Sequence, residues 1–254
     1  MLSRKGIDGA LSLLVTIFLF NLVGCSEGQT NNEEAHAISW YPGFTMPELL
    51  AANVDIEKRE DLAALLSKDW YASIDVANTR SAEEDAFSNC QEYFREATPK
   101  TRTLREHEMN AFVELAVMCR ATELMVGAKT PRKSYIPEDI LTASSPEKFP
   151  SEIAFETSKT ESEKNRNDPL VKHWGDINKI REVNAVSPYA VDFYTMGGVQ
   201  RLELVGRGDF DGDGVEDVLL SSRDSVDGGS YQHLRLFVLS VDADGDWRTI
   251  KSYQ

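Results

Sequence analysis

The nine residues Asp209-Phe210-Asp211-Gly212-Asp213-Gly214-Val215-Glu216-Asp217 carry the clearest chemical signal in the chain. Aspartates stand at the first, third, fifth and ninth positions, and glycine stands at the sixth. Ca²⁺ takes about six to eight oxygen ligands, and a glycine at the sixth position allows the sharp turn that wraps a loop around the ion. We therefore expect one Ca²⁺ to be bound by four carboxylates and one backbone carbonyl, from Asp209, Asp211, Asp213, Asp217 and Val215.

The sequence on both sides of this loop predicts strands rather than helices. An EF-hand places a bidentate glutamate at position 12, whereas this chain has Leu220 there, inside an apolar run. A helix–loop–helix sensor is therefore not predicted. The pattern Gly-Asp-Phe-Asp-Gly-Asp-Gly-x-x-Asp followed by an apolar strand resembles the FG-GAP and VCBS repeats of integrin-like propellers. The resemblance covers about 20 of the 254 residues, and it implies a β-hairpin with a structural Ca²⁺.

A second acidic stretch, Asp242-x-Asp244-x-Asp246, is the only other candidate loop. Its sixth position is Trp247 and its ninth is Ile250, so it lacks the glycine and the last aspartate of the first loop. We interpret it as an acidic hairpin turn. Propellers need several repeats because one blade cannot bury its own faces. A single good loop therefore predicts a single sheet module.

Catalytic motifs are weak by comparison. His107-Glu108 begins a His-Glu-x-x-His zinc pattern, but the fifth residue is Ala111, so that site fails. His36, His173 and His233 are isolated, and no Gly-x-Ser-x-Gly elbow or phosphate-binding loop is present. No catalytic residue is assigned, and a non-catalytic binding or structural role is favoured.

Two other functions stay open. A periplasmic hydrolase or enzyme inhibitor would have its site in the cleft between the helical part and the sheet, with a pocket near His173 or His233. An adhesion or envelope-assembly protein would instead expose an apolar patch on the sheet or on its hairpin.

The N-terminus indicates export and membrane anchoring. Arg4 and Lys5 precede an apolar run over residues 10–20, which is short for a transmembrane helix. The following Leu22-Val23-Gly24-Cys25 resembles the lipobox of bacterial lipoproteins. That resemblance implies removal of residues 1–24, lipidation of Cys25 and, because Ser26 follows, sorting to the outer membrane. An ordinary secretory peptide with an incidental cysteine is the alternative.

Charge and cysteine content narrow the remaining choices. The formal net charge of −15 disfavours nucleic acid and anionic lipid as partners. Once Cys25 is lipidated, Cys90 and Cys119 remain, and an even number in an oxidising compartment favours one disulfide. Two buried free thiols are the alternative. A membrane is the expected partner through Cys25, and an unidentified envelope protein is a further candidate.

The chain is expected to have an α+β fold, in which an N-terminal helical hairpin region precedes a C-terminal antiparallel meander with the Asp-rich loop. The expected segments are a signal peptide (1–24), a lipidated cysteine and flexible tether (25–45), a mainly helical region (46–130), a mixed connector (131–188) and the sheet (189–254).

Local patterns predict the individual elements. Asp55 is the expected cap of a helix that carries Ile56 to Leu66, and Trp70 to Val76 is weakly extended. Capping-box patterns predict a helix after Ser81-x-x-Glu84 that ends before Pro99, and a second after Thr103-x-x-Glu106 that ends at Gly127. A short helix is predicted over residues 170–183, and a solvated loop or exposed helix over residues 158–168. Alternating apolar residues predict strands over 189–196, 199–205, 215–221, 231–241 and 247–253.

Overall fold

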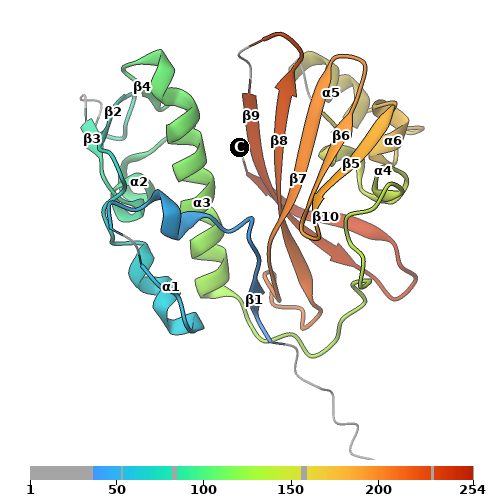
Figure 1. Ribbon diagram of the computed structural model, residues 1–254, viewed down its shortest axis with the longest axis horizontal. Helices are drawn as coiled ribbons and strands as arrows, with labels where there is room; N and C mark the ends of the chain where they lie inside the picture. The colour runs from blue at the N-terminus through green and yellow to red at the C-terminus, as the bar shows by residue number, and fades with distance from the viewer. Residues whose placement is uncertain (1–36, 53, 82–84, 156–158, 230–231, 254) are drawn as a thin grey trace, which may run out of the picture. The chain divides into compact units, whose positions relative to one another are not determined.

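The computed structural model describes residues 37–52, 54–81, 85–155, 159–229 and 232–253 (Figure 1). The predicted signal peptide, Cys25 and the first part of the tether lie outside these residues. The described part contains both helices and antiparallel sheets, so the α+β class is confirmed. In chain order the elements are β1 (Ser39–Trp40), η1 (Met46–Leu49), α1 (Arg59–Leu65), β2 (Ile74–Ala77), β3 (Asp85–Phe87), α2 (Cys90–Glu96), β4 (Arg102–Thr103), η2 (Glu106–Glu108), α3 (Met109–Gly127), α4 (Ser145–Lys148), η3 (Ser151–Ile153), α5 (Lys159–Arg166), α6 (Trp174–Ile177), β5 (Glu182–Ser187), β6 (Ala190–Tyr194), β7 (Gly198–Gly208), β8 (Asp217–Val226), β9 (Gln232–Val241) and β10 (Trp247–Tyr253).

The main sheet is an antiparallel meander. Its strand order is β10-β9-β8-β7-β6-β5, so each strand pairs with its neighbour in the sequence. β1 pairs with the end of β7, with Ser39 opposite Arg207, so the last part of the predicted tether is a strand. The helix predicted over 170–183 is wrong. Only Trp174–Ile177 is helical there, and β5 follows and pairs with β6.

The central strands are buried on both faces, which explains why β9 is apolar almost throughout. On one face, Leu234, Leu236 and Val238 pack in a core with residues of α1, α2 and α3. On the other face, Phe237 and Leu239 pack with Phe149, Ile153 and Trp174 of the connector. In the ribbon, α3 lies on one side of the sheet, and α4 and α6 lie on the other (Figure 1). An antiparallel sheet with one solvated face would alternate apolar and polar residues. Here the side chains on both faces of the central strands are buried.

A buried ion pair fixes the connector to the second face of the sheet. The Arg235 guanidinium on β9 contacts the Asp224 carboxylate on β8 at 2.8 Å, and both side chains are almost fully buried. Arg235 also donates to the carbonyls of Glu152, Ile153 and Ala154 at 3.0, 3.2 and 2.7 Å. The η3 turn is thus fixed to the sheet through its own backbone. Burial raises the pKa of Asp224, although Arg235 acts to lower it.

The helices of the N-terminal region begin later than predicted. α1 is preceded by Lys58 rather than Asp55, and the Asp61 carboxylate accepts from the Lys58 backbone N–H at 3.1 Å. The helix predicted after Ser81 starts at Cys90, because strand β3 lies in between. Glu84, the second residue of that capping box, lies outside the described residues.

The second predicted capping box is also replaced by other structure. Arg102–Thr103 form β4, which pairs with β2, and the turn η2 separates β4 from α3. Together β3, β2 and β4 make a three-stranded antiparallel sheet in a region predicted to be mainly helical. The weakly predicted strand near Ile74 is its central strand. α3 ends at Gly127, as predicted.

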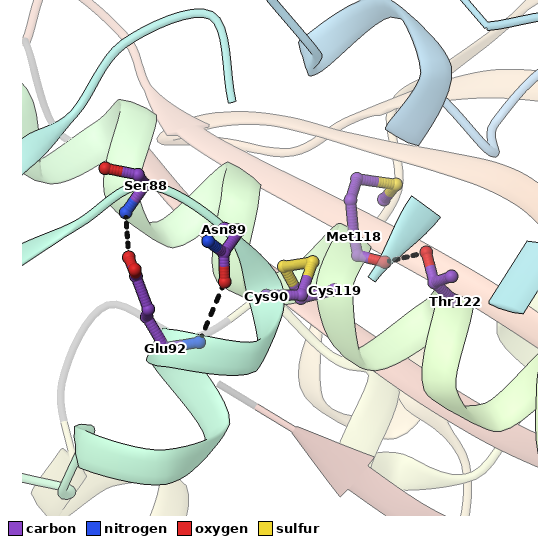
Figure 2. The surroundings of a disulfide bond; sticks show 7 residues. All are labelled: Ser88, Asn89, Cys90, Glu92, Met118, Cys119 and Thr122. Atoms are coloured by element: carbon purple, nitrogen blue, oxygen red, sulfur yellow. Dashed lines mark hydrogen bonds between the residues drawn. A yellow bond between two sulfur atoms is a disulfide. The ribbon is translucent and has the colours of Figure 1, made fainter. Parts of the chain in front are cut away.

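A disulfide between Cys90 and Cys119 joins α2 to the middle of α3, with the two Cα atoms 5.3 Å apart (Figure 2). Asn89 positions the first cysteine, because its side chain accepts from the Glu92 backbone N–H at 3.0 Å and caps α2. The Glu92 carboxylate accepts in return from the Ser88 N–H at 2.7 Å. The Glu92 carboxylate thus accepts from the residue before the N-cap, and the N-cap itself lies eight residues after Ser81, where the sequence pattern predicted it.

Candidate metal centre

The Asp-rich loop connects β7 to β8, so the pairing of two long strands holds its ends together. Gly208 lies opposite Asp217 in the register, which places Asp209 and Asp217 at the two sides of the hairpin end. Residues at the first and ninth positions of the loop therefore meet across the hairpin. The predicted hairpin position of the loop is confirmed.

Backbone N–H groups inside the loop point at its carboxylates. Asp209 accepts from the N–H groups of Gly212 at 2.6 Å and Gly214 at 3.0 Å. Both glycines have φ near +90°, at +88° and +87°, a conformation that a side chain disfavours. Asp211 accepts from the Asp213 N–H, and Asp213 from the Val215 N–H, at 3.0 and 2.7 Å. The loop is folded around its first aspartate.

Three carboxylates converge. Asp209, Asp211 and Asp217 each offer an oxygen, and these oxygens lie within 4.8 Å of one another. Asp209 and Asp217 are buried, while Asp211 is exposed. Three like charges so close together repel, and a cation between them would remove that repulsion. The cluster could hold a metal ion.

The buried carboxylate of Asp217 is a second, independent indication that a cation belongs at this site. Its side chain is fully buried, and one oxygen accepts from the Phe210 N–H at 3.0 Å. The Ser240 hydroxyl, opposite on β9, is close enough to this carboxylate to act to lower its pKa, but neither Ser240 Oγ nor Asp217 Oδ1 makes a well-formed hydrogen bond among the described residues. Burial, together with the charges of Asp211 and Asp213, raises the pKa of Asp217 to about 6. A buried carboxylate oxygen without a well-formed hydrogen bond is costly, and one oxygen of the Asp217 carboxylate lies within 4.8 Å of oxygens of Asp209 and Asp211.

The other two predicted ligands are placed differently. The Asp213 carboxylate lies outside the cluster and contacts the Arg248 guanidinium of β10 at 3.3 Å. Val215 forms an isolated bridge with Lys133, and the role of its carbonyl as a ligand stays a prediction.

The segment after α3, residues 129–134, crosses the loop and was not predicted to belong to the site. Lys129 and Asp209 exchange backbone hydrogen bonds at 2.8 and 3.1 Å, and the Arg132 N–H donates to the Gly214 carbonyl at 2.9 Å. Ser134 Oγ donates to the Glu216 carboxylate at 2.6 Å. We call residues 129–134 the strap. The only sequence signal for it was a cluster of basic residues in an acidic chain.

The strap also brings positive charge to the loop. A side chain at Gly212 would meet the Lys129 ammonium, and one at Gly214 would meet the Arg132 guanidinium, at 2.8 and 2.6 Å from the added carbon. With Arg248 these groups partly balance the loop's carboxylates. A cation must therefore compete with three basic side chains.

The second acidic turn and the candidate histidines do not join this centre. Asp242 accepts from the N–H groups of Asp244 and Asp246, both at 3.0 Å, as in an ordinary acidic turn. His173 is half-exposed, with Asp176 at 3.9 Å. His233 lies on β9 and is partly buried.

No protein-family model, curated protein or solved structure matches this chain. Within the residues that the structure describes, no helix has the length and apolar character needed to cross a membrane.

Proposed function

We propose that this chain is a lipid-anchored protein of the bacterial envelope that binds one structural Ca²⁺ and acts as a non-catalytic binding or structural module. The observation that carries the Ca²⁺ part is the convergence of one oxygen each from Asp209, Asp211 and Asp217 within 4.8 Å, together with the buried Oδ1 of Asp217, which makes no well-formed hydrogen bond among the described residues. All three groups are oxygen ligands, which hard cations prefer and which zinc sites rarely use alone.

Ca²⁺ fits this loop better than Mg²⁺. Mg²⁺ demands near-ideal octahedral geometry, whereas Ca²⁺ accepts irregular sets of carboxylates, carbonyls and water. The cluster has two buried carboxylates and one exposed carboxylate, so water would complete the ligand set on the open side. The three nearby basic groups place the affinity in the weak, extracellular class, with a Kd of about 10⁻⁴–10⁻³ M.

The expected role of the ion is to join parts of the chain that are distant in sequence. The loop holds the strap by backbone hydrogen bonds, and the strap follows directly from α3. An ion bound to Asp209 and Asp217 would stabilise the hairpin and, through it, the connection from the helical region to the sheet. Such a role requires neither catalysis nor a conformational switch.

Ca²⁺ is expected to raise the melting temperature of the wild-type protein. For a Kd of about 10⁻⁴–10⁻³ M, 10 mM Ca²⁺ adds roughly 1.4–2.7 kcal/mol to the free energy of unfolding. Asp217→Asn should abolish this gain and melt higher than wild type in EDTA, because it removes a buried charge. Asp242→Asn, the same change in the acidic turn, is the control. Equal wild-type melts in Ca²⁺ and EDTA would contradict the site.

Ca²⁺ affinity should fall below about pH 6. The folded-state pKa of Asp217 is about 6, above its ordinary value of 3.8, so the cation-free folded protein binds this proton more tightly than the unfolded chain does. Between these values the cation-free protein gains stability as the pH falls. Because Ca²⁺ needs the ionised carboxylate, its apparent Kd at pH 5 should be about tenfold weaker than at pH 8. Calorimetric titration measures this, and a flat profile would contradict it.

The anchor has a separate test. We propose that Cys25 is lipidated and that Ser26 directs the protein to the outer membrane, because Leu22-Val23-Gly24-Cys25 follows an apolar export segment. Wild type should partition into the detergent phase of Triton X-114, and Cys25→Ala should move to the aqueous phase. Cys25→Ala should retain the Ca²⁺-dependent shift in melting temperature. An unchanged detergent partition would refute the anchor while leaving the metal site intact.

A further inference from the structure

A cavity of about 400 Å³ lies where α2, α3 and the end of β10 meet. Three aromatic side chains line it, from Tyr93 and Phe94 of α2 and from Tyr253 of β10, and two arginines, Arg80 and Arg120, reach it from different elements. The volume is within the range of about 300–1,000 Å³ that small-molecule sites occupy. None of the Ca²⁺ loop residues lines it.

Small side chains create the hollow. Ala97, the residue directly after α2, and Ala116 on α3 both line the cavity. Larger residues at these two positions would fill the space between the helices. The disulfide between Cys90 and Cys119 joins the same two helices, so the spacing between the walls is fixed covalently.

The charge of the lining is opposite to that of the whole protein. The chain has 42 acidic and 27 basic residues, yet both ionised side chains among the described lining residues are arginines. An anion that is repelled by the rest of the surface would meet favourable charge here. Arg120 already donates through Nη1 to the Glu123 carboxylate, one turn further along α3 and outside the lining, so a bound anion would share the guanidinium with Glu123.

The arginines are held in place before any ligand arrives. The Arg120 guanidinium lies 4.7 Å from the centre of the Phe94 ring and 5.2 Å from that of the Tyr253 ring. Arg80 donates to the Arg95 carbonyl at 2.7 Å through one amino group. Stacking and a fixed hydrogen bond reduce the entropy lost when a guanidinium binds an anion.

We propose that this cavity binds a small organic anion in which a carboxylate is attached to a flat apolar ring system. The carboxylate would bind the guanidinium groups of Arg80 and Arg120, whose planar donors match its two oxygens. The ring would lie against Tyr93, Phe94 and Tyr253, where aromatic stacking is favourable. This site is separate from the proposed Ca²⁺ function and does not depend on it.

The test compares 2-naphthoate with its neutral counterpart 2-naphthamide by ligand-observed NMR titration of the full-length protein. A ligand of this size is expected to bind with a Kd of about 1 mM. Wild type should bind the naphthoate more tightly than the amide. Arg80→Gln should weaken naphthoate binding about tenfold and leave the amide unchanged, because only the anion uses the guanidinium. Arg105→Gln makes the same change at an exposed arginine outside the lining and should alter neither.

A second variant tests the cavity itself. Ala116→Leu should fill the space and remove binding of both compounds, with the melting temperature confirming that the variant folds. The proposal is overturned if wild type binds neither compound, if it binds both equally, or if Arg80→Gln leaves naphthoate binding unchanged. Binding that survives Ala116→Leu also overturns it, because the ligand would then lie elsewhere.

Discussion

Arg235→Met is expected to lower the free energy of unfolding by about 3–5 kcal/mol at pH 7, the usual cost of removing one partner of a buried ion pair. The change leaves the Asp224 carboxylate buried, with Ser222 still donating to it at 2.9 Å. It also removes the donor for the carbonyls of Glu152, Ile153 and Ala154, in and directly after the η3 turn. Methionine fills a similar volume, so the loss reports polar groups left without partners rather than a large cavity.

The matched control is Arg201→Met on the same sheet. Arg201 pairs with Asp192 at 2.7 and 2.8 Å, and the Arg201 side chain is 41% exposed, whereas that of Asp192 is only 9% exposed. Water can replace the hydrogen bonds of the guanidinium more easily than those of the carboxylate. The expected cost therefore lies above that of an exposed pair, about 1 kcal/mol or less, and below that of Arg235→Met. Urea unfolding of both variants measures the difference. Equal costs at the two positions would show that the Arg235 pair contributes no more than a pair with one exposed partner.

The pH dependence of this loss separates charge from packing. Burial already raises the pKa of Asp224, and loss of Arg235 removes the cation that lowers it. Protonation would then relieve the buried charge, so the cost of Arg235→Met should shrink as the pH falls. The double variant Asp224→Leu/Arg235→Met should be more stable than Arg235→Met alone. A cost independent of pH, with no recovery in the double variant, would indicate packing as the cause.

The meander could be predicted because its signals are local. The acidic hairpin turn expected between residues 242 and 246 is present, and Gly245 within it has a positive φ of +88°. Strand β5 was missed for a local reason too. Ile177, Ile180 and Val183 have helical spacing, but all three pack into the second core as the chain enters the sheet edge. Pairing with β6 therefore overrides a weak helical pattern.

The capping boxes failed because a four-residue pattern contains no information about competing strands. Residues 85–87 and 102–103 pair with β2 instead of continuing a helix. Asn89 then caps α2, and α3 starts at Met109. In this arrangement Cys90 at the start of α2 and Cys119 in the middle of α3 form the disulfide.

The metal centre was partly predictable, because some of its residues are close in sequence and others are not. Asp209, Asp211 and Asp217 lie in one hairpin, so their spacing predicts their convergence. The strap does not follow from spacing, because Ser134 and Glu216 are 82 residues apart. The arginine-lined cavity was not predictable either, since it exists because two alanines from separate helices, Ala97 and Ala116, face it.

Removal of the disulfide is expected to cause the second large loss in the free energy of unfolding. Cys90 and Cys119 are separated by 29 residues, and closing a loop of this length in the unfolded chain stabilises the folded state by about 3–4 kcal/mol. The double variant Cys90→Ala/Cys119→Val should therefore lose about that much in urea unfolding, and its m-value should rise, because an uncrosslinked unfolded chain exposes more surface.

The location of the disulfide predicts what this variant retains. The bond joins α2 and α3 in the first core, whereas the Asp-rich loop is held by β7, β8 and the strap. The Ca²⁺-dependent gain in stability should therefore survive, while naphthoate binding should weaken, because the walls of the cavity are no longer linked. A loss below about 1 kcal/mol would mean that the unfolded chain is already compact around these cysteines. Unchanged naphthoate binding would show that packing alone fixes the spacing of the two helices.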